Sequence, residues 1–389
     1  MNSKAVIVGL FVVAVGAILF YNARRGREPS LSPGKAAGAG VTVSVLYSTE
    51  KRDWLEAATN AFSREHSGIN VQLQGKGSLE AAQELVEGKA KPVLWSPADS
   101  LVLGLAASDW QTKYGTQLFA AEGSGDAAQP LVITPLVFVV WEDRAEPLLK
   151  YAGGKLSWHA IHEAVASNRG WPAVGGKPEW GFVKLGHTDP TRSNSGLQAL
   201  LLMSLEYYKK NSGLTVAELL DPKYQQWVKE IEKGVGKFET STGTFMMDMV
   251  RFGPSRFDIA VVYESLAASQ LENAQGRWGN LKVFYPVTTI WSDHPMALLQ
   301  GDWVSEEQKK AARTYLAFLR SRAIQEQALG YGFRPADPAV AVKTADPHNP
   351  FVRLAPYGLR VDIPPATTPP DPAVVRNLLT MWSRVVANP

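Results

Sequence analysis

Residues 41–96 read VTVSVLYSTEKRDWLEAATNAFSREHSGINVQLQGKGSLEAAQELVEGKAKPVLWS, and this stretch decides the fold. Its first run, VTVSVLYS, is apolar and β-branched and predicts a buried strand. Apolar side chains at helical spacing then follow from Trp54 to Phe62. INVQLQG predicts a second strand, a helix over 79–87 is expected to end at Gly88, and VLWS predicts a third strand.

The alternation of strands and helices predicts a parallel sheet with right-handed crossovers. Ligands of such sheets bind at the carboxyl ends of the strands. Those ends are residues 47–50, 75–78 and 95–97, and two of them run directly into helix starts. Backbone N–H groups at a helix start receive anions and polar oxygens. A site for a small polar molecule is therefore expected at this edge of the sheet.

The remaining chain predicts a second lobe. The apolar run LVITPLVFVVWED, interrupted by Pro135, is expected to leave the first lobe and enter the second. LKVFYPVTTIWSDHPMALL is expected to return, with hinges near residues 130–137 and 282–288. Between them we expect a strand near 182–184, the strand DIAVVYES, and helices over 158–168, 196–210, 224–234 and 245–252. A helix over 306–329 and a proline-rich surface strap are expected to complete the chain.

Composition limits the class of protein. A chain of 389 residues exceeds what one hydrophobic core usually serves, and 45% hydrophobic with 20% charged residues is ordinary for a globular protein. The net charge of +3 is small and comes partly from Arg24, Arg25 and Arg27, so nothing favours a nucleic-acid partner. The absence of cysteine excludes disulfides, thiolate metal sites, thiol catalysis and a lipid-carrying cysteine.

The N-terminus carries an uncharged apolar run from Ala5 to Tyr21, followed by the three arginines. This run is near the short limit for a membrane span. A retained anchor, a cleaved signal peptide and a buried core helix are the alternatives, and the lack of a cleavage site close to the run favours the anchor.

The expected domains follow from these segments. Residues 1–27 form an N-terminal signal or membrane anchor, and the Pro/Gly/Ala-rich residues 28–40 a flexible linker. Residues 41–133 and 286–389 form lobe I, which includes the C-terminal strap. Residues 134–285 form lobe II.

Five segments, in this order, resemble the molybdate/sulfate-type branch of the bacterial extracellular solute-binding proteins, and of these an uncharacterised subgroup. They are GSLEAAQELVEG, HTDPTRSNSGLQALL, FDIAVVYES, VFYPV and EQALGYGFRP. The resemblance runs from about Val41 to Pro335. It implies an α/β, two-lobed type II periplasmic-binding-protein fold, each lobe a mixed, mostly parallel sheet flanked by helices.

The resemblance also implies ligand-binding positions. Ser78 matches the family's ligand-binding serine, Ser195 or Gly196 its backbone donor, and Tyr263 its ligand-facing tyrosine. Where the family has a short Ala-Ala-Ser turn, this chain has Ser48, Thr49 and Glu50, and a carboxylate there would repel an oxyanion unless Lys51 or Arg192 offsets it. The full set of expected ligand-binding residues is Ser48, Thr49, Glu50, Ser78, Ser96, Thr134, Ser193, Ser195, Gly196, Thr242 and Tyr263.

Each of these residues has a structural alternative. A Ser or Thr that precedes a helix is commonly an N-cap, and a cap with a spare lone pair also lines a cleft. Arg192, Arg256 and Lys51 are surface charges unless they face the ligand. Trp95, Trp291 and Trp303 are a stacking wall or core residues. His159 and His162 lie at metal-ligand spacing on a helix but have no evident third partner, so no metal and no cofactor are expected.

These observations predict an extracytoplasmic solute-binding protein that closes two lobes on a small polar ligand. An oxyanion is the leading expectation, and an ABC-type permease the expected partner. The alternative is a membrane-anchored interaction module of an envelope complex that keeps the fold without uptake. No enzyme motif is complete, and only Glu50 with Lys51 would offer a catalytic pair, so the chain is not expected to be an enzyme. The expected location is the periplasm or cell surface, with the N-terminal helix in the membrane.

Overall fold

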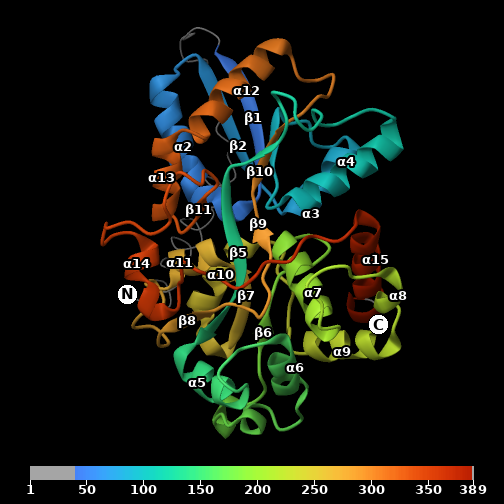
Figure 1. Cartoon of the computed structure of the whole chain (residues 1–389), viewed down its shortest axis with the longest axis vertical. Helices are drawn as coiled ribbons and strands as arrows, with labels where there is room; N and C mark the ends of the chain where they lie inside the picture. Colours follow the sequence, from blue (N-terminus) through green and yellow to red (C-terminus); the bar gives the residue numbers. More distant parts are fainter. Residues whose placement is uncertain (1–39, 388–389) are drawn as a thin grey trace, which may run out of the picture. The chain divides into compact units, whose positions relative to one another are not determined.

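The computed structural model describes residues 40–387 (Figure 1). The expected signal or anchor at 1–27, and the linker at 28–40 except for Gly40, lie outside the described residues. Among residues 40–387, no helix has the length and apolar character that crossing a membrane requires.

The first sheet confirms the predicted parallel core. Strands β1 (Val41–Tyr47), β2 (Ile69–Gly75) and β3 (Leu94–Ser96) are parallel, in the order β2-β1-β3. Next to β3 lie the antiparallel strand β10 (Pro295–Leu298) and then β4 (Gln129–Pro130). The helices that follow the first three strands, or that lie beside the sheet, are η1 (Thr49–Lys51), α2 (Arg52–Glu65), α3 (Ser78–Glu87), α4 (Ser100–Tyr114), α12 (Glu306–Leu319) and α13 (Arg322–Gly330).

The second sheet is built around the long strand β5 (Val132–Trp141), which carries Pro135. Its neighbours are β11 (Arg334–Pro335), β7 (Ile259–Tyr263), β8 (Leu281–Phe284) and β9 (Trp291–Ser292), all antiparallel to it. Only β6 (Leu185–Gly186) pairs parallel, with β7. This sheet is therefore mixed but not mostly parallel as expected, because β5 enters from the first lobe against the direction of its neighbours.

Successive residues of β5 serve two different cores. Leu136, Phe138 and Val140 pack on one face and Val137, Val139 and Trp141 on the other, which is the period-two alternation of a strand covered on both sides. Helices cover both faces: α5 (Glu142–Tyr151), α6 (Trp158–Ala166), α7 (Asn194–Tyr207), α8 (Val216–Leu219), α9 (Pro222–Glu232), α10 (Thr242–Phe252) and α11 (Glu264–Gln270).

The chain passes between the two lobes three times: before β5, after β9, and between α13 and β11. The chain leaves β4 and enters β5 at Leu131, within the expected hinge (Figure 1). The return crossing lies between β9 and β10, at residues 293 and 294, later than the expected 282–288, because β8 and β9 still pair with β5. The lobe boundaries themselves stay a prediction.

The C-terminal residues run over the second lobe. Helix α14 (Pro350–Arg353) contributes Phe351 to the core that holds Val137, and α15 (Pro372–Trp382) contributes Leu378 and Trp382 to the core that holds Phe138. Helix α15 packs with α8 of the second lobe and also contacts α4 of the first (Figure 1), so the assignment of the strap to lobe I stays a prediction. Its Arg376 also reaches Asp109 of α4, at 2.6 Å.

Two local predictions were wrong. The helix expected over 306–329 is two helices, because Ser321 begins α13 after α12 has ended at Leu319. The strand expected near 182–184 lies at Leu185–Gly186, and Phe182 is instead 65% exposed.

Candidate functional site

The three carboxyl ends of the parallel strands meet at one edge of the first sheet, as predicted. Ser48 donates its N–H to the carbonyl oxygen of Ser96 at 3.0 Å, and the Ser78 hydroxyl accepts from the N–H of Ala98 at 3.0 Å. All three serines are buried, and the Ser96 hydroxyl has no hydrogen-bond partner within the described chain. The loops after β1, β2 and β3 are thus joined to one another.

A buried charged cluster lies directly behind this edge. The Ser48 hydroxyl donates to the Glu50 carboxylate, and the Lys51 ammonium donates to the Ser48 hydroxyl. Lys51 Nζ also donates to the carbonyl oxygens of Ser96 and Pro97, each at 3.2 Å, and lies 3.6 Å from Glu50 Oε1. Both side chains are almost fully buried, at 0% and 3% exposure.

His294 completes this cluster. Its Nδ1 lies 3.2 Å from both Lys51 Nζ and Glu50 Oε1. Burial would raise the pKa of Glu50, but the charge of Lys51 and the bond to His294 outweigh it and lower the pKa to about 2. Burial lowers the pKa of Lys51 to about 8, against the opposing effect of Glu50. Burial and the charge of Lys51 lower the pKa of His294 to about 4. Glu50 is therefore ionised, and the positive charge of the Lys51 ammonium compensates its negative charge.

A second buried cluster joins the lobes through Asp99, the N-cap of α4. Asp99 Oδ1 accepts from the N–H of Leu101 at 2.6 Å. Its Oδ2 accepts from Gln198 Nε2 at 2.6 Å and Asn194 Nδ2 at 3.2 Å, both on α7 of the second lobe. Gln198 Nε2 also donates to Ser292 Oγ at 2.8 Å. Burial raises the pKa of Asp99 to about 6.

The predicted hydroxyl residues of the second lobe form a third group. Ser195 Oγ lies 2.7 Å from Thr242 Oγ1 and 2.7 Å from Thr188 Oγ1, and Ser193 Oγ lies 3.2 Å from Thr242 Oγ1. From the first lobe, Thr49 Oγ1 lies 2.8 Å from Ser241 Oγ. We call these six residues the hydroxyl cluster: Thr49, Thr188, Ser193, Ser195, Ser241 and Thr242.

Two serines of the hydroxyl cluster stand at N-cap positions without capping. Ser193 precedes α7 and Ser241 precedes α10, yet neither side chain accepts a capping hydrogen bond from a backbone N–H of its own helix. First-turn N–H groups have no acceptor inside their helix. The N-terminal turns of α7 and α10 therefore keep N–H groups that no capping side chain occupies. Gly196 permits this arrangement, since a Cβ there would lie 2.1 Å from the Thr188 carbonyl oxygen.

Two expected ligand residues have other contacts. The Thr134 hydroxyl accepts from the N–H of Ser265 at 3.1 Å, in the first turn of α11. The Tyr263 hydroxyl accepts from Asn194 Nδ2 at 3.0 Å, and burial raises the pKa of this fully buried tyrosine. Thr134 thus lies at the hinge, and Tyr263 within the cluster around Asp99.

The other candidate side chains, two arginines and three tryptophans, have contacts outside the three clusters. Arg192 pairs with Glu80 at 3.0 Å, and Arg256 with Glu239 at 2.6 Å. Trp95 stacks on Phe119 in the core of the first lobe, Trp303 packs against that core, and Trp291 lies beneath Arg334. These tryptophans form no common wall. His162 pairs with Glu230 at 2.8 Å, and no group of three metal-ligating side chains occurs within residues 40–387.

Several residues of these clusters were missed at the sequence level: Asp99, Asn194, Gln198, Ser292 and His294. Asp99 had a usable signal, since it stands three residues after the end of a strand and directly before a helix, in the segment WSPADS. Asn194 and Gln198 are four residues apart and so share a helix face. Nothing local marks His294, whose partners come from the other end of the chain.

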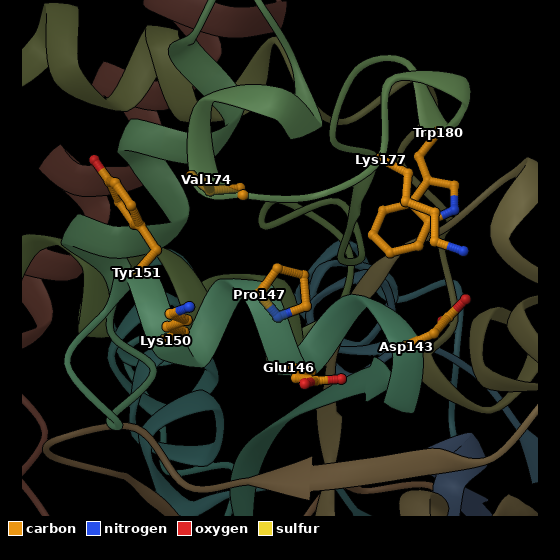
Figure 2. A pocket seen from close by; sticks show the side chains of 9 residues that line it. Asp143, Glu146, Pro147, Lys150, Tyr151, Val174, Lys177 and Trp180 are labelled. Atoms are coloured by element: carbon orange, nitrogen blue, oxygen red, sulfur yellow. The ribbon is translucent and has the colours of Figure 1, made fainter.

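One cavity of the described chain is lined by residues of the clusters, and a larger one lies away from them. One of about 70 Å³ opens beside Thr49, Ser241 and Met247, between the lobes. A larger pocket of about 710 Å³ lies on the second lobe between α5 and the 171–180 loop, as Figure 2 shows. Its lining includes Tyr151, Lys177 and Trp180 and none of the residues of the three clusters. We place the candidate site at the clusters, because their polar atoms converge from both lobes.

The comparisons with known proteins agree with this geometry. The family model of bacterial extracellular solute-binding proteins matches residues 43–334, so the chain belongs to that family, whose members act outside the cytoplasm on small solutes. The resemblance seen in the sequence is thereby confirmed. Comparison with curated proteins gives no match.

Solved structures share the type II periplasmic-binding fold. The sulfate-binding protein SubI from Mycobacterium tuberculosis H37Rv is 16% identical, with a TM-score of 0.55 over 89% of this chain and 98% of that one. The periplasmic binding protein AfuA from Actinobacillus pleuropneumoniae, with fructose-6-phosphate bound, is 15% identical, with a TM-score of 0.59 over 90% and 100%. Iron-bound HitA from Pseudomonas aeruginosa is 18% identical, with a TM-score of 0.57 over 89% and 99%.

Proposed function

We propose that this solute-binding protein is a receptor that closes its two lobes on an oxyanion, held by the hydroxyl cluster and the first turns of α7 and α10. One observation carries the proposal: Ser193 and Ser241 stand at N-caps but leave their helices uncapped, and their hydroxyls bond instead to Thr242 and Thr49. The helix N–H groups are thereby left to an outside acceptor.

The chemistry of the hydroxyl cluster suits an oxyanion. Thr49 bonds to Ser241, and Thr188, Ser195, Thr242 and Ser193 form one connected chain of hydrogen bonds. Hydroxyl groups can rotate their hydrogens toward an acceptor that arrives. The N-terminal ends of α7 and α10 add a favourable potential for negative charge. Ser48, Ser78 and Gly196 remain proposed contacts of the anion. Ser96, whose hydroxyl has no partner within the described chain, is proposed to face the same cleft without contacting the anion. The repulsion expected from Glu50 is offset by Lys51, which pairs with it in the interior.

We propose that the protein selects its ligand by closing the two lobes on it. Thr49 with Ser241, Glu80 with Arg192, and Asp99 with Gln198 are contacts between residues of different lobes. The chain crosses between the sheets on short strands, which is the geometry of hinge closure. A ligand that bonds to both lobes favours the closed state.

The direct test is thermal unfolding of the purified full chain with a panel of sulfate, phosphate, molybdate, sugars and peptides. A ligand that binds only the folded chain raises its unfolding temperature, and an oxyanion should do so. Ser195→Ala should abolish most of that increase, whereas Ser255→Ala, on an exposed serine whose hydroxyl donates to the Phe252 carbonyl oxygen, should leave it intact. A folded protein whose unfolding temperature responds to no oxyanion contradicts the proposal.

We propose an ABC-type permease as the partner and binding without catalysis as the role. Glu50 and Lys51, the one candidate catalytic pair, are buried and bonded to each other, which supports this assignment. Residues 1–27 are proposed to hold the chain in the membrane. Fractionation of cells with the full chain and with a chain lacking residues 1–27 tests the anchor. Pull-down from membranes tests the partner: a permease supports uptake, whereas an envelope protein without a permease supports the interaction module.

A further inference from the structure

Four buried polar atoms near the site have no hydrogen-bond partner within residues 40–387: Asn194 Oδ1, Gln198 Oε1, Ser96 Oγ and His294 Nε2. All four residues are at most 1% exposed. A buried polar atom without a partner costs about 1–3 kcal/mol, and native proteins keep few of them. Ligand atoms or ordered water must therefore complete the hydrogen bonds of these four.

Asp99 determines which way the two amides face. Its Oδ2 accepts from Asn194 Nδ2 and Gln198 Nε2, so turning either amide around would set its carbonyl oxygen against a carboxylate. The second hydrogen of each amide is also used, by the Tyr263 hydroxyl at 3.0 Å and by the Ser292 hydroxyl at 2.8 Å. Both N–H hydrogens of each amide are therefore engaged in hydrogen bonds, and only the carbonyl oxygen of each amide remains free to accept one.

The residues that carry the unpartnered atoms are linked by a chain of contacts through Tyr263 and Lys51. The two amides lie one turn apart on α7 and so share a face. Asn194 bonds to Tyr263, whose ring meets the His294 ring at 5.9 Å between centroids. His294 contacts Lys51, which donates to the carbonyl oxygen of Ser96. The same helix α7 also carries Ser195 of the hydroxyl cluster. The unpartnered atoms therefore adjoin the proposed oxyanion site.

A bare oxyanion does not match these atoms. The two amide oxygens only accept hydrogen bonds, and a fully deprotonated anion has no hydrogen to offer them. Its charge would also meet that of Asp99, in a buried region where screening is weak. Hydroxyl groups both donate and accept, so they satisfy an amide oxygen, a serine hydroxyl and either tautomer of an imidazole nitrogen.

We propose that the ligand is a hydroxylated oxyanion: a polyol or sugar that carries a phosphate or sulfate group. The anionic group lies on the hydroxyl cluster, and the ligand hydroxyls bond to Asn194 Oδ1, Gln198 Oε1 and Ser96 Oγ. This inference rests on the proposed function, since it adds contacts for the ligand hydroxyls beside the proposed contacts for the anion.

Ser96→Ala is the sharpest variant, because the Ser96 hydroxyl has no partner and its removal costs no hydrogen bond within the described chain. We would titrate the full chain at pH 7 by calorimetry with glucose 6-phosphate, glycerol 3-phosphate, glucose 6-sulfate, inorganic phosphate, inorganic sulfate and glucose. At least one ester should bind about tenfold or more tightly than its inorganic anion. Ser96→Ala should weaken that ester about fivefold to thirtyfold and leave the inorganic anion unchanged.

Ser195→Ala is the comparison, and it should weaken the ester and the inorganic anion alike. If inorganic anions bind as tightly as every ester, or if Ser96→Ala leaves ester affinity unchanged, the inference is overturned while the proposed function stands. Free glucose that binds as tightly as its esters overturns both. A folded protein that binds none of the six probes overturns this inference, and the proposed function falls with it if molybdate also leaves the unfolding temperature unchanged.

Discussion

A side-chain carbon on Gly77 would lie 2.8 Å from the carbonyl oxygen of Arg192 and 3.1 Å from that of Thr240. The start of α3 in the first lobe therefore lies against two backbone segments of the second. Beside this contact, the N–H of Glu80 donates to the same Arg192 oxygen at 3.3 Å. Backbone atoms cannot turn aside as the end of a flexible side chain can, so the closed arrangement depends on the absence of a side chain at residue 77.

We expect Gly77→Ala to impair closure without impairing folding. The Gly77 backbone, at φ −59° and ψ 140°, suits alanine, so the lobes themselves should fold. Overpacking a tight contact costs about 1–3 kcal/mol, which corresponds to a loss of ligand affinity of about fivefold to more than a hundredfold. Calorimetry with the anion that raises the unfolding temperature measures the loss. Gly104→Ala, where a side chain meets nothing within 4 Å, is the control and should keep full affinity.

Lys51→Met should raise the pKa of His294. Burial and the charge of Lys51 together hold this pKa at about 4, while Glu50 acts in the opposite direction. Without Lys51, Glu50 becomes an unpaired buried carboxylate 3.2 Å from the ring, and proton uptake by His294 restores a pair. NMR titration should show a rise of roughly two pH units. His294→Gln assigns the signal, and Lys76→Met, which removes a partly exposed lysine paired with Glu84, should not shift it. A pKa that stays near 4 in Lys51→Met would refute this account.

Trp382→Phe tests how firmly the C-terminal helix is held. Trp382 Nε1 donates to Glu232 Oε1 at 2.8 Å, and Glu232 Oε2 accepts from His187 at 2.7 Å in a fully buried pair. Phenylalanine keeps an aromatic ring in the core but removes the donor, so the free energy of unfolding should fall by about 1–3 kcal/mol. Denaturation with guanidinium measures this. Trp278→Phe, at a position 49% exposed, should change it by less than about 0.5 kcal/mol.

The sequence predicted the helices and strands better than it predicted which of them pair and in which direction. Strand β1 and helix α2 follow from apolar periodicity, which is a local property. The antiparallel course of the second sheet was missed, because the direction in which β5 meets β7 depends on a crossing between lobes. The break between α12 and α13 was also missed, since Ser321 interrupts an otherwise continuous apolar pattern.

The residues of the candidate site also fall into those that the sequence predicted and those that depend on distant contacts. Ser193, Ser195 and Thr242 were predicted from their place before helices, and the structure brings them together. His294 and Gln198 were not predicted, because their partners lie 243 and 99 residues away in the chain, at Lys51 and Asp99. Only the closed tertiary structure brings such residues into contact. A single sequence shows their types but not their neighbours.

Asp99 gives the folded protein a specific dependence on pH. Burial first, and the nearby charge of Asp293 second, raise its pKa from 3.8 to about 6. Between these values the folded state binds more protons at this group than the unfolded state does. The stability that the group contributes is therefore fully present below pH 3.8 and is lost as the pH rises through about 6. The gap of roughly two pH units corresponds to on the order of 3 kcal/mol.

Asp99→Asn cannot titrate, and asparagine is an equally good N-cap for α4. From pH 4 to pH 7.5, the free energy of unfolding of this variant, relative to that of the unchanged protein, should rise by up to that amount. Asp126→Asn is the control: Arg313 lowers the pKa of this partly exposed carboxyl, so the relative free energy should move slightly in the opposite direction. Guanidinium unfolding of all three proteins at both pH values measures the changes, and a difference for Asp99→Asn that does not depend on pH would show that Asp99 does not titrate in this range.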